Sequence, residues 1–183
     1  MMRVNEIFYS LQGEGVHAGC PAVFVRFSGC NRACEFCDTD FARFSEMTEE
    51  EIVEAISRYP AEIVIFTGGE PALQLTDSLV RAVQATGRRV HVETNGSLPL
   101  PDSVDWVTCS PKTPPYSIGR IDELKVLLTP GADPEAIAAQ LPRARAYCLQ
   151  PLSCSNTDLC VDWLKAHPRW RLSLQTHKLI NIR

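Results

Sequence analysis

Seven short apolar runs, separated by turns or by helical patterns, constrain the fold more than any other feature of this sequence. The runs are rich in β-branched and aromatic residues. Most are apolar enough to be buried on both faces, as the strands of a parallel sheet are. The predicted strands are residues 22–27, 62–66, 89–92, 104–108, 124–128, 144–149 and 170–174.

Helical patterns lie between several of these runs. Thr48 and Glu51 form a capping box, in which each side chain bonds the backbone of the other residue, and Pro71 suits the first position of a helix. Prolines interrupt the segment between Val104 and Leu128, so no helix is predicted there. The predicted helices run from Thr48 to Tyr59, from Pro71 to a stop at Gly87, from Asp133 to about Leu141, and over residues 155–166.

Strands that alternate with helices indicate an α/β fold built on a parallel sheet. A complete eight-unit barrel typically needs ~250 residues, whereas this chain has 183. We therefore expect a partial, open TIM-like barrel of about six parallel strands, with some helices missing. The length also predicts a single domain over residues 1–183, because domains usually hold about 100–200 residues.

Composition and charge narrow the class of protein. Hydrophobic residues make up 45% of the chain, which excludes a disordered protein. The formal net charge is −4, so no nucleic-acid partner is expected. The N-terminal residues lack the apolar core of a signal peptide, and no apolar run approaches the ~20 residues of a membrane span. We expect a cytoplasmic protein without a membrane partner, whose thiols stay reduced.

Three of the eight cysteines crowd into one loop. Cys30, Cys34 and Cys37 follow the first predicted strand with the spacing CxxxCxxC. Three thiolates from one loop can bind three corners of a [4Fe–4S] cluster, and one iron then stays open, because full ligation takes four cysteines. The alternatives are a chance grouping of buried thiols or a zinc site with a fourth ligand from Cys20 or a histidine. The spacing favours the iron–sulfur interpretation and leaves the others open.

Phe36, directly before the third cysteine, makes the loop similar to the signature of the radical S-adenosylmethionine (SAM) superfamily. The resemblance implies that the open iron binds SAM and that an electron from the cluster generates a 5′-deoxyadenosyl radical. Thr67-Gly68-Gly69-Glu70 resembles the GGE motif of the same proteins, and polar residues end the next strands at a shared rim. The implied SAM-binding residues are Phe36, Asp38, Gly68, Gly69, Glu70, Ser110, Pro111, Lys112 and Gln150, with Glu93 and Asn95 beside them.

Two further segments, residues 11–15 (LQGEG) and 175–178 (QTHK), resemble the 7-carboxy-7-deazaguanine synthases, one family of that superfamily. The resemblance implies a lyase that converts 6-carboxy-5,6,7,8-tetrahydropterin to 7-carboxy-7-deazaguanine. The radical removes the hydrogen at C6, the ring contracts with loss of ammonia, and SAM is regenerated. No side chain beyond the cluster-bound SAM is predicted to be catalytic. A glycyl-radical-enzyme activating protein is the alternative within the superfamily.

The same resemblance assigns the substrate, a metal ion and partners. Thr39 would bind Mg²⁺ through an oxygen ligand. Arg26 would hold the substrate carboxyl group through two hydrogen bonds, unless it pairs with a neighbouring acid instead. An electron donor of the flavodoxin or ferredoxin type and a second copy of the chain, forming a homodimer, are the implied protein partners. The implied pterin contacts are Leu11, Gln12, Gly13, Arg26 and Thr67, with Glu14 as a further candidate, and His177 is kept as a candidate site residue.

Overall fold

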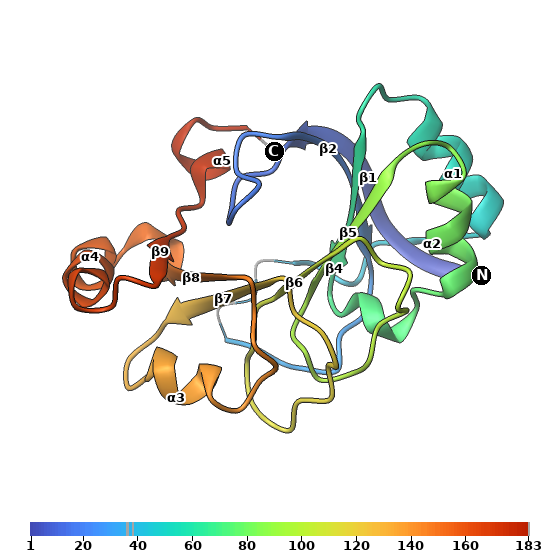
Figure 1. Ribbon diagram of the computed structural model, residues 1–183. Coiled ribbons are helices and arrows are strands. Elements are labelled where there is room, and N and C mark those ends of the chain that lie inside the picture. The colour runs from blue at the N-terminus through green and yellow to red at the C-terminus, as the bar shows by residue number, and fades with distance from the viewer. Residues whose placement is uncertain (36, 38, 183) are drawn as a thin grey trace.

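A curved, mostly parallel sheet forms the centre of the part of the chain that the structure describes. This computed structural model describes residues 1–35, 37 and 39–182, and its strand order is β3-β1-β2-β4-β5-β6-β7-β8-β9 (Figure 1). β2 and β4 to β9 are parallel, whereas β1 is antiparallel to both of its neighbours. The strands are β1 Met2–Leu11, β2 Pro21–Phe27, β3 Ser45–Met47, β4 Ile63–Gly68, β5 Arg89–Thr94, β6 Trp106–Cys109, β7 Glu123–Leu128, β8 Ala146–Pro151 and β9 Trp170–Leu172.

Because β3 and β9 lie at opposite edges and do not pair, the sheet is an open barrel. All seven predicted strands are present within it. The prediction of a partial parallel barrel with missing helices is therefore confirmed. Two strands were not predicted, β1 and β3.

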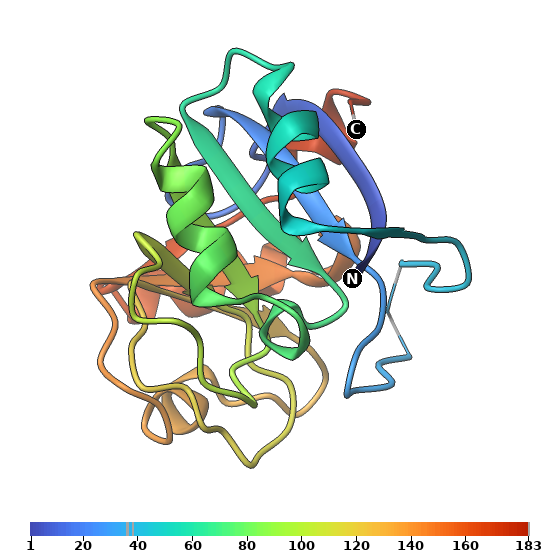
Figure 2. The same cartoon turned by 90° about the vertical axis from the view of Figure 1, so that its right-hand side faces the viewer.

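Short helices cover the outer face of the sheet. Helices α1 and α2 lie side by side over the first half of the sheet (Figure 2), while α3 packs on β7 and α4 on β8 and β9. Among the described residues, none of the helices has the length and apolar character needed to cross a membrane. The helices are α1 Glu49–Ser57, α2 Asp77–Gln84, α3 Pro134–Ala138, α4 Thr157–Ala166 and α5 Thr176–Leu179, with single turns of 3-10 helix at Pro71–Leu73 and Leu152–Cys154.

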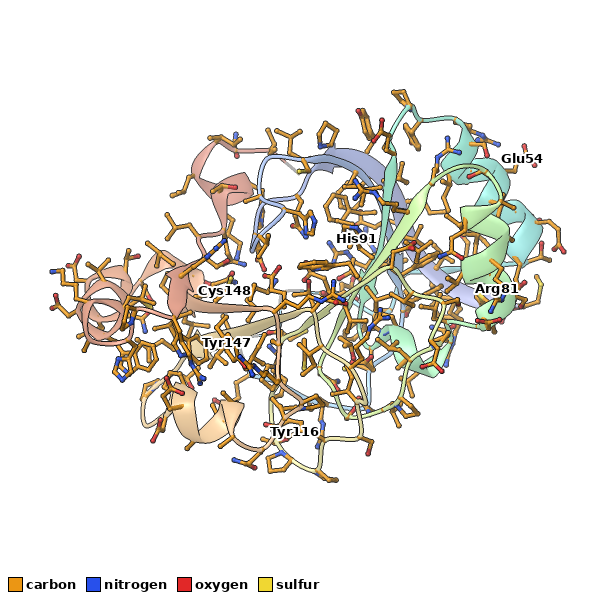
Figure 3. The ribbon with its side chains drawn as sticks, in the orientation of Figure 1. Glu54, Arg81, His91, Tyr116, Tyr147 and Cys148 are labelled. Atoms are coloured by element: carbon orange, nitrogen blue, oxygen red, sulfur yellow. The ribbon has the colours of Figure 1, made fainter. Side chains whose placement is uncertain are left out.

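The two faces of the sheet differ in chemistry. Side chains alternate between faces along a strand, and the outer face carries the main hydrophobic core, including Val64, Val92 and Leu124. The inner face carries a small apolar cluster on β1, β2 and β4, in which the rings of Phe8 and Phe24 stack with centroids 5.0 Å apart. Farther along, the inner face is polar: the buried polar residues of β5, β7 and β8 include His91, Glu123, Lys125 and Gln150. In Figure 3, His91 and Cys148 lie inside the curve of the sheet, and Glu54 and Arg81 lie on the outer helices.

A β-bulge explains why β1 was not predicted. The register of β1 against β2 shifts between Val4 and Glu6, and a bulge reverses the alternation of faces beyond it. Val4 therefore packs in the outer core and Phe8 in the inner cluster, although an even spacing would put both on one face. Because the alternation is broken, a search for apolar residues at every second position does not detect this strand.

The helix predicted from Pro71 to Gly87 is wrong in one respect, because the chain forms a 3-10 turn and a separate helix α2 there. The Gln74 side chain lies between them, accepts a hydrogen bond from the Arg3 amide (2.7 Å) and donates one to the Ser28 carbonyl (2.9 Å). The Thr76 hydroxyl then caps α2 by accepting from the Leu79 amide (3.1 Å). Likewise α4 begins at Thr157, two residues later than predicted.

Candidate active site

A cavity of about 300 Å³ lies at the carboxyl ends of the parallel strands and collects most of the predicted site residues. The loops that follow the parallel strands β2, β4, β5, β6 and β8 contribute to its walls, as expected for an α/β fold. The loop that follows the antiparallel strand β1 begins beside the amino end of β2 and also lines the cavity. Segments that are far apart in the sequence thus converge on one volume. The predicted residues that line it are Leu11, Gln12, Gly13, Arg26, Cys30, Cys34, Cys37, Thr39, Thr67, Gly68, Gly69, Ser110, Lys112 and Gln150, joined by Glu14, Glu93, Asn95 and His177.

The three clustered cysteines share one wall of this cavity and are free thiols. A turn brings two of them together, because the Cys37 amide donates to the Cys34 carbonyl (3.1 Å). Within residues 1–35, 37 and 39–182, no three His, Cys, Asp or Glu side chains converge on a single ion position. A [4Fe–4S] cluster takes each thiolate on a different iron, and the three free cysteines that line this cavity offer three such ligands.

The Glu70 carboxylate is not among the groups that line the cavity, and a contact between Glu70 and SAM stays a prediction. It is 0% exposed, and protein donors take both of its oxygens. Oε1 accepts from the Thr94 hydroxyl (2.7 Å) and the Ala72 amide (3.0 Å), and Oε2 accepts from the Asn95 amide (2.7 Å). Burial raises the pKa of Glu70, although these hydrogen bonds act in the opposite direction. Glu70 therefore fixes the turn after β4 to the loop after β5.

Replacement of Glu70 by glutamine is expected to lower the free energy of unfolding by about 2 to 3 kcal/mol, because an NH₂ group would face a buried donor in place of one oxygen. Urea unfolding at neutral pH measures the difference. Glu54→Gln on α1 is the matched control, since its side chain is 75% exposed. Equal unfolding free energies for the two variants would contradict the role given to Glu70.

The remaining predicted SAM residues are Pro111, Phe36 and Asp38. Pro111 lines a second cavity of about 290 Å³, and Arg32, Cys34 and Lys112 border both cavities. A contact between Pro111 and SAM stays a prediction. Phe36 and Asp38 lie outside the described residues.

The N-terminal and C-terminal segments that resemble the synthase family pack against each other. The Gly13 carbonyl accepts from the Thr176 amide (2.9 Å) and hydroxyl (2.8 Å). Glycine at position 13 allows this close approach, because a Cβ there would lie 2.0 Å from Nδ1 of His177 and would displace that side chain. The two segments thus form one side of the cavity together.

A buried lysine, which the sequence interpretation did not single out, links two acids of the cavity. The Lys125 ammonium group donates to Oε2 of Glu14 and to Oε2 of Glu93 (3.0 Å). The opposite oxygens accept from side-chain amides, Gln175 on Glu14 (2.7 Å) and Gln12 on Glu93 (2.7 Å). The available signal was a lysine inside an otherwise apolar strand, residues 124–128.

The pKa values of this network are shifted. Burial on its own would lower the pKa of Lys125, but the Glu14 and Glu93 carboxylates beside it raise it. Burial would raise the pKa of Glu14, but the contact with Lys125 lowers it to about 2. At neutral pH Lys125 and Glu14 are therefore both charged.

The depressed pKa of Glu14 predicts a pH-dependent contribution to stability. In the unfolded chain Glu14 takes up a proton near its ordinary pKa of 4.5, whereas in the folded protein it does so near 2. Its contribution is complete above about pH 4.5 and is lost as the pH falls toward 2. The unfolding free energies of the wild type and of Glu14→Gln should therefore differ most near neutral pH and converge on acidification. A difference that stays constant with pH would contradict this contribution.

Arg26 forms the ion pair that was the alternative to its predicted role, and binding of a substrate carboxyl group by Arg26 stays a prediction. Its side chain lines the cavity, and its Nε donates to Oε1 of Glu6 (2.8 Å). The guanidinium also lies over the Phe8 ring, 5.9 Å from the centroid. The ion pair with Glu6 uses one of the five guanidinium donors, so a substrate carboxylate can still bind the others.

Comparison with known proteins identifies the class of this cavity. A model of the radical SAM superfamily matches residues 24–147, and the chain belongs to that superfamily. Membership implies a [4Fe–4S] cluster and SAM as cofactors. Proteins named 7-carboxy-7-deazaguanine synthase are similar over nearly the whole chain: 55% identity in Bacteroides thetaiotaomicron, covering 100% of both chains, and 42% in Burkholderia multivorans, covering 98% of both. Within the superfamily, the chain belongs to the 7-carboxy-7-deazaguanine synthase family.

A solved structure agrees with this placement. The crystal structure of QueE from Escherichia coli matches with a TM-score of 0.83 at 30% identity, and the match covers 96% of this chain and 94% of that one. The similarity therefore includes the strands that contribute to the cavity from both ends of the chain.

Proposed function

We propose that the protein converts 6-carboxy-5,6,7,8-tetrahydropterin to 7-carboxy-7-deazaguanine with loss of ammonia, as a radical SAM lyase. One observation supports this most strongly: a single cavity holds both the cysteine wall and the residues that the synthase family is expected to use for its substrate. The alternative, a glycyl-radical-enzyme activating protein, is not favoured, because full-length relatives carry the synthase name.

The chain offers residues for both cofactors. Cys30, Cys34 and Cys37 would hold the cluster, and the backbone of Gly68 and Gly69 would lie against SAM. When bound, the cluster and SAM together supply a radical that removes and returns one hydrogen atom. The role of the protein is to position the reactants and exclude water. Further SAM contacts are proposed for Ser110, Lys112 and Gln150, and for Phe36 and Asp38, which lie outside the described residues.

The substrate would be held at two chemically different ends of the cavity. Arg26 on β2 supplies a cation for the carboxyl group, while the anionic Glu14 faces the cavity near the LQG segment and accepts from ring N–H groups. Thr67 and residues 11–13 would complete the contacts. We further propose that the Thr39 hydroxyl, which lines the same cavity, binds Mg²⁺.

Arg26→Gln is expected to weaken binding of the tetrahydropterin roughly 10- to 100-fold, the range that a lost charge-assisted hydrogen bond produces. Equilibrium binding under anaerobic conditions measures the change. Glu6→Gln is the control, because it removes the ion pair but keeps the guanidinium. If both variants lose affinity equally, Arg26 acts only through its pair with Glu6.

The experiment that tests the proposed function is anaerobic reconstitution of the full chain with iron and sulfide, followed by reaction with SAM and reductant. With the tetrahydropterin present, we expect the ring-contracted product and one ammonia per product. If the reconstituted protein is given SAM, reductant and the tetrahydropterin and forms no ring-contracted product, the proposal is overturned. One zinc ion and no acid-labile sulfide in anaerobically prepared protein would also overturn it.

We also propose that residues 1–183 act as one radical SAM domain. The domain would work as a homodimer and take its electron from a protein of the flavodoxin or ferredoxin type. The core strands on both sides of residues 24–147, namely β1 and β9, belong to the same sheet as the matched region, which supports a single unit.

A further inference from the structure

Lys125 is the most deeply buried cation at the cavity, and the reaction described above gives it no role. It projects from the inner face of β7 with a side-chain exposure of 3%. An unpaired ammonium group at that depth would be costly. The structure pairs it with two carboxylates that come from separate parts of the chain, Glu14 after β1 and Glu93 at the end of β5.

Charged and titratable groups face Lys125 from every side. Besides its two carboxylate partners, Glu123 lies on the same strand and adds a third negative charge. Lys112 and Cys148 are the other titratable groups near it. Acids therefore outnumber cations around this position. If the ammonium group were removed, three neighbouring carboxylates, of which Glu14 and Glu93 are partly buried, would face one another without a cation between them, and uptake of a proton would be favoured.

The geometry of the two partners determines what they offer to a ligand. One oxygen of each carboxylate is held by Lys125 and the other by an amide, Gln175 on Glu14 and Gln12 on Glu93. Neither carboxylate can rotate without breaking two hydrogen bonds. Each ionised oxygen still has a lone pair to share, and both acids line the cavity. Together they form a fixed pair of acceptors, suited to a flat ring that carries several N–H donors.

We propose that Lys125 is a positioning residue: it holds the Glu14 and Glu93 carboxylates in a fixed orientation, so that the cavity binds the N–H-bearing edge of the pterin ring and orients its carboxyl group toward Arg26. This inference rests on the proposed function, because the pterin is the substrate of that reaction. Lys125 itself makes no contact with the reacting atoms in this assignment. Its effect passes entirely through the two acids.

The first test measures binding of 6-carboxypterin, an oxidised and unreactive form of the substrate, to Lys125→Met without cofactors. At neutral pH we expect affinity to fall at least about tenfold, because one acceptor becomes protonated. As the pH is raised above neutral, the ratio of variant to wild-type affinity should recover as that proton is lost. A ratio that is constant with pH would show a merely structural role and overturn the proposal. Lys165→Met, on a side chain that is 72% exposed, is the control and should bind like the wild type.

The second test needs no ligand and therefore separates this inference from the proposed function. The infrared difference spectrum of Lys125→Met against the wild type should show the C=O band of a newly protonated carboxyl group. The double variant Lys125→Met/Glu14→Gln restores the charge balance of the pair, so the band should disappear. If the single variant fails to fold, the double variant should still fold, because its charges balance, and it then tests the role of Lys125 in this pair. A missing band in the single variant, or a band that persists in the double variant, would overturn the role of Lys125.

Discussion

Replacement of Cys34 by alanine is expected to abolish both the iron–sulfur cluster and the activity. The remaining thiols, Cys30 and Cys37, would leave two irons without a protein ligand, and a cluster held by two thiolates is not expected to survive isolation. Because enzymes accelerate reactions by at least about 10⁶-fold, product formation should fall by at least about a thousandfold. The measurements are iron and acid-labile sulfide per chain, and 5′-deoxyadenosine and product formed under anaerobic conditions.

Cys20→Ala is the matched control for this prediction. Cys20 is also a free, half-buried thiol, but it packs beside the inner apolar cluster and does not line the cavity. Its variant should keep the full iron content and the full activity. Equal losses in both variants would indicate general misfolding, and a Cys34→Ala protein that retains cluster and activity would contradict the ligand assignment.

The parts of the fold that sequence reasoning predicted correctly are those in which local pattern and burial agree. The parallel strands are short, β-rich and enclosed, and turn residues or helices separate them, so the pattern reports the sheet directly. Strand β1 was not predicted, because a bulge after Val4 reverses the alternation of its side chains between the two faces of the sheet. The single predicted helix became two elements because the Gln74 side chain binds Arg3 and Ser28, a contact between distant parts of the chain. No local pattern contains that information.

The candidate site shows the same limit. A motif predicts which residues surround a ligand, but it does not fix the direction of each side chain. Glu70 illustrates this, since the motif does not reveal that its carboxylate accepts hydrogen bonds from Thr94, Ala72 and Asn95. Lys125 illustrates the opposite case. A lysine inside an apolar run marks its position in the sequence, but its partners could not be identified there, because they lie 111 and 32 residues away along the chain.

The backbone of the turn after β4 lies close to the backbone at the start of the cysteine loop, and this contact supports the loop. The turn after β4 packs directly on the start of the cysteine loop. The Gly69 amide donates to the Phe27 carbonyl (3.2 Å), and the Glu70 amide donates to the Gly29 carbonyl (3.0 Å). A Cβ on Gly69 would lie 1.8 Å from the Gly29 oxygen and 3.0 Å from the Cys30 nitrogen. Backbone atoms cannot move aside as a flexible side chain can, so any larger residue must displace the loop.

Gly69→Ala is therefore expected to lower the free energy of unfolding by about 3 kcal/mol, at the upper end of the cost of overpacking, and to reduce the iron bound on reconstitution. Chemical unfolding and iron analysis measure the two effects. Gly119→Ala is the matched control, because a Cβ there meets no heavy atom within 4 Å. If Gly69→Ala is as stable as Gly119→Ala and binds as much iron, the packing of the turn on Gly29 does not hold the cysteine loop in place. If stability falls but iron binding per folded chain is unchanged, the contact supports the fold and not the cluster.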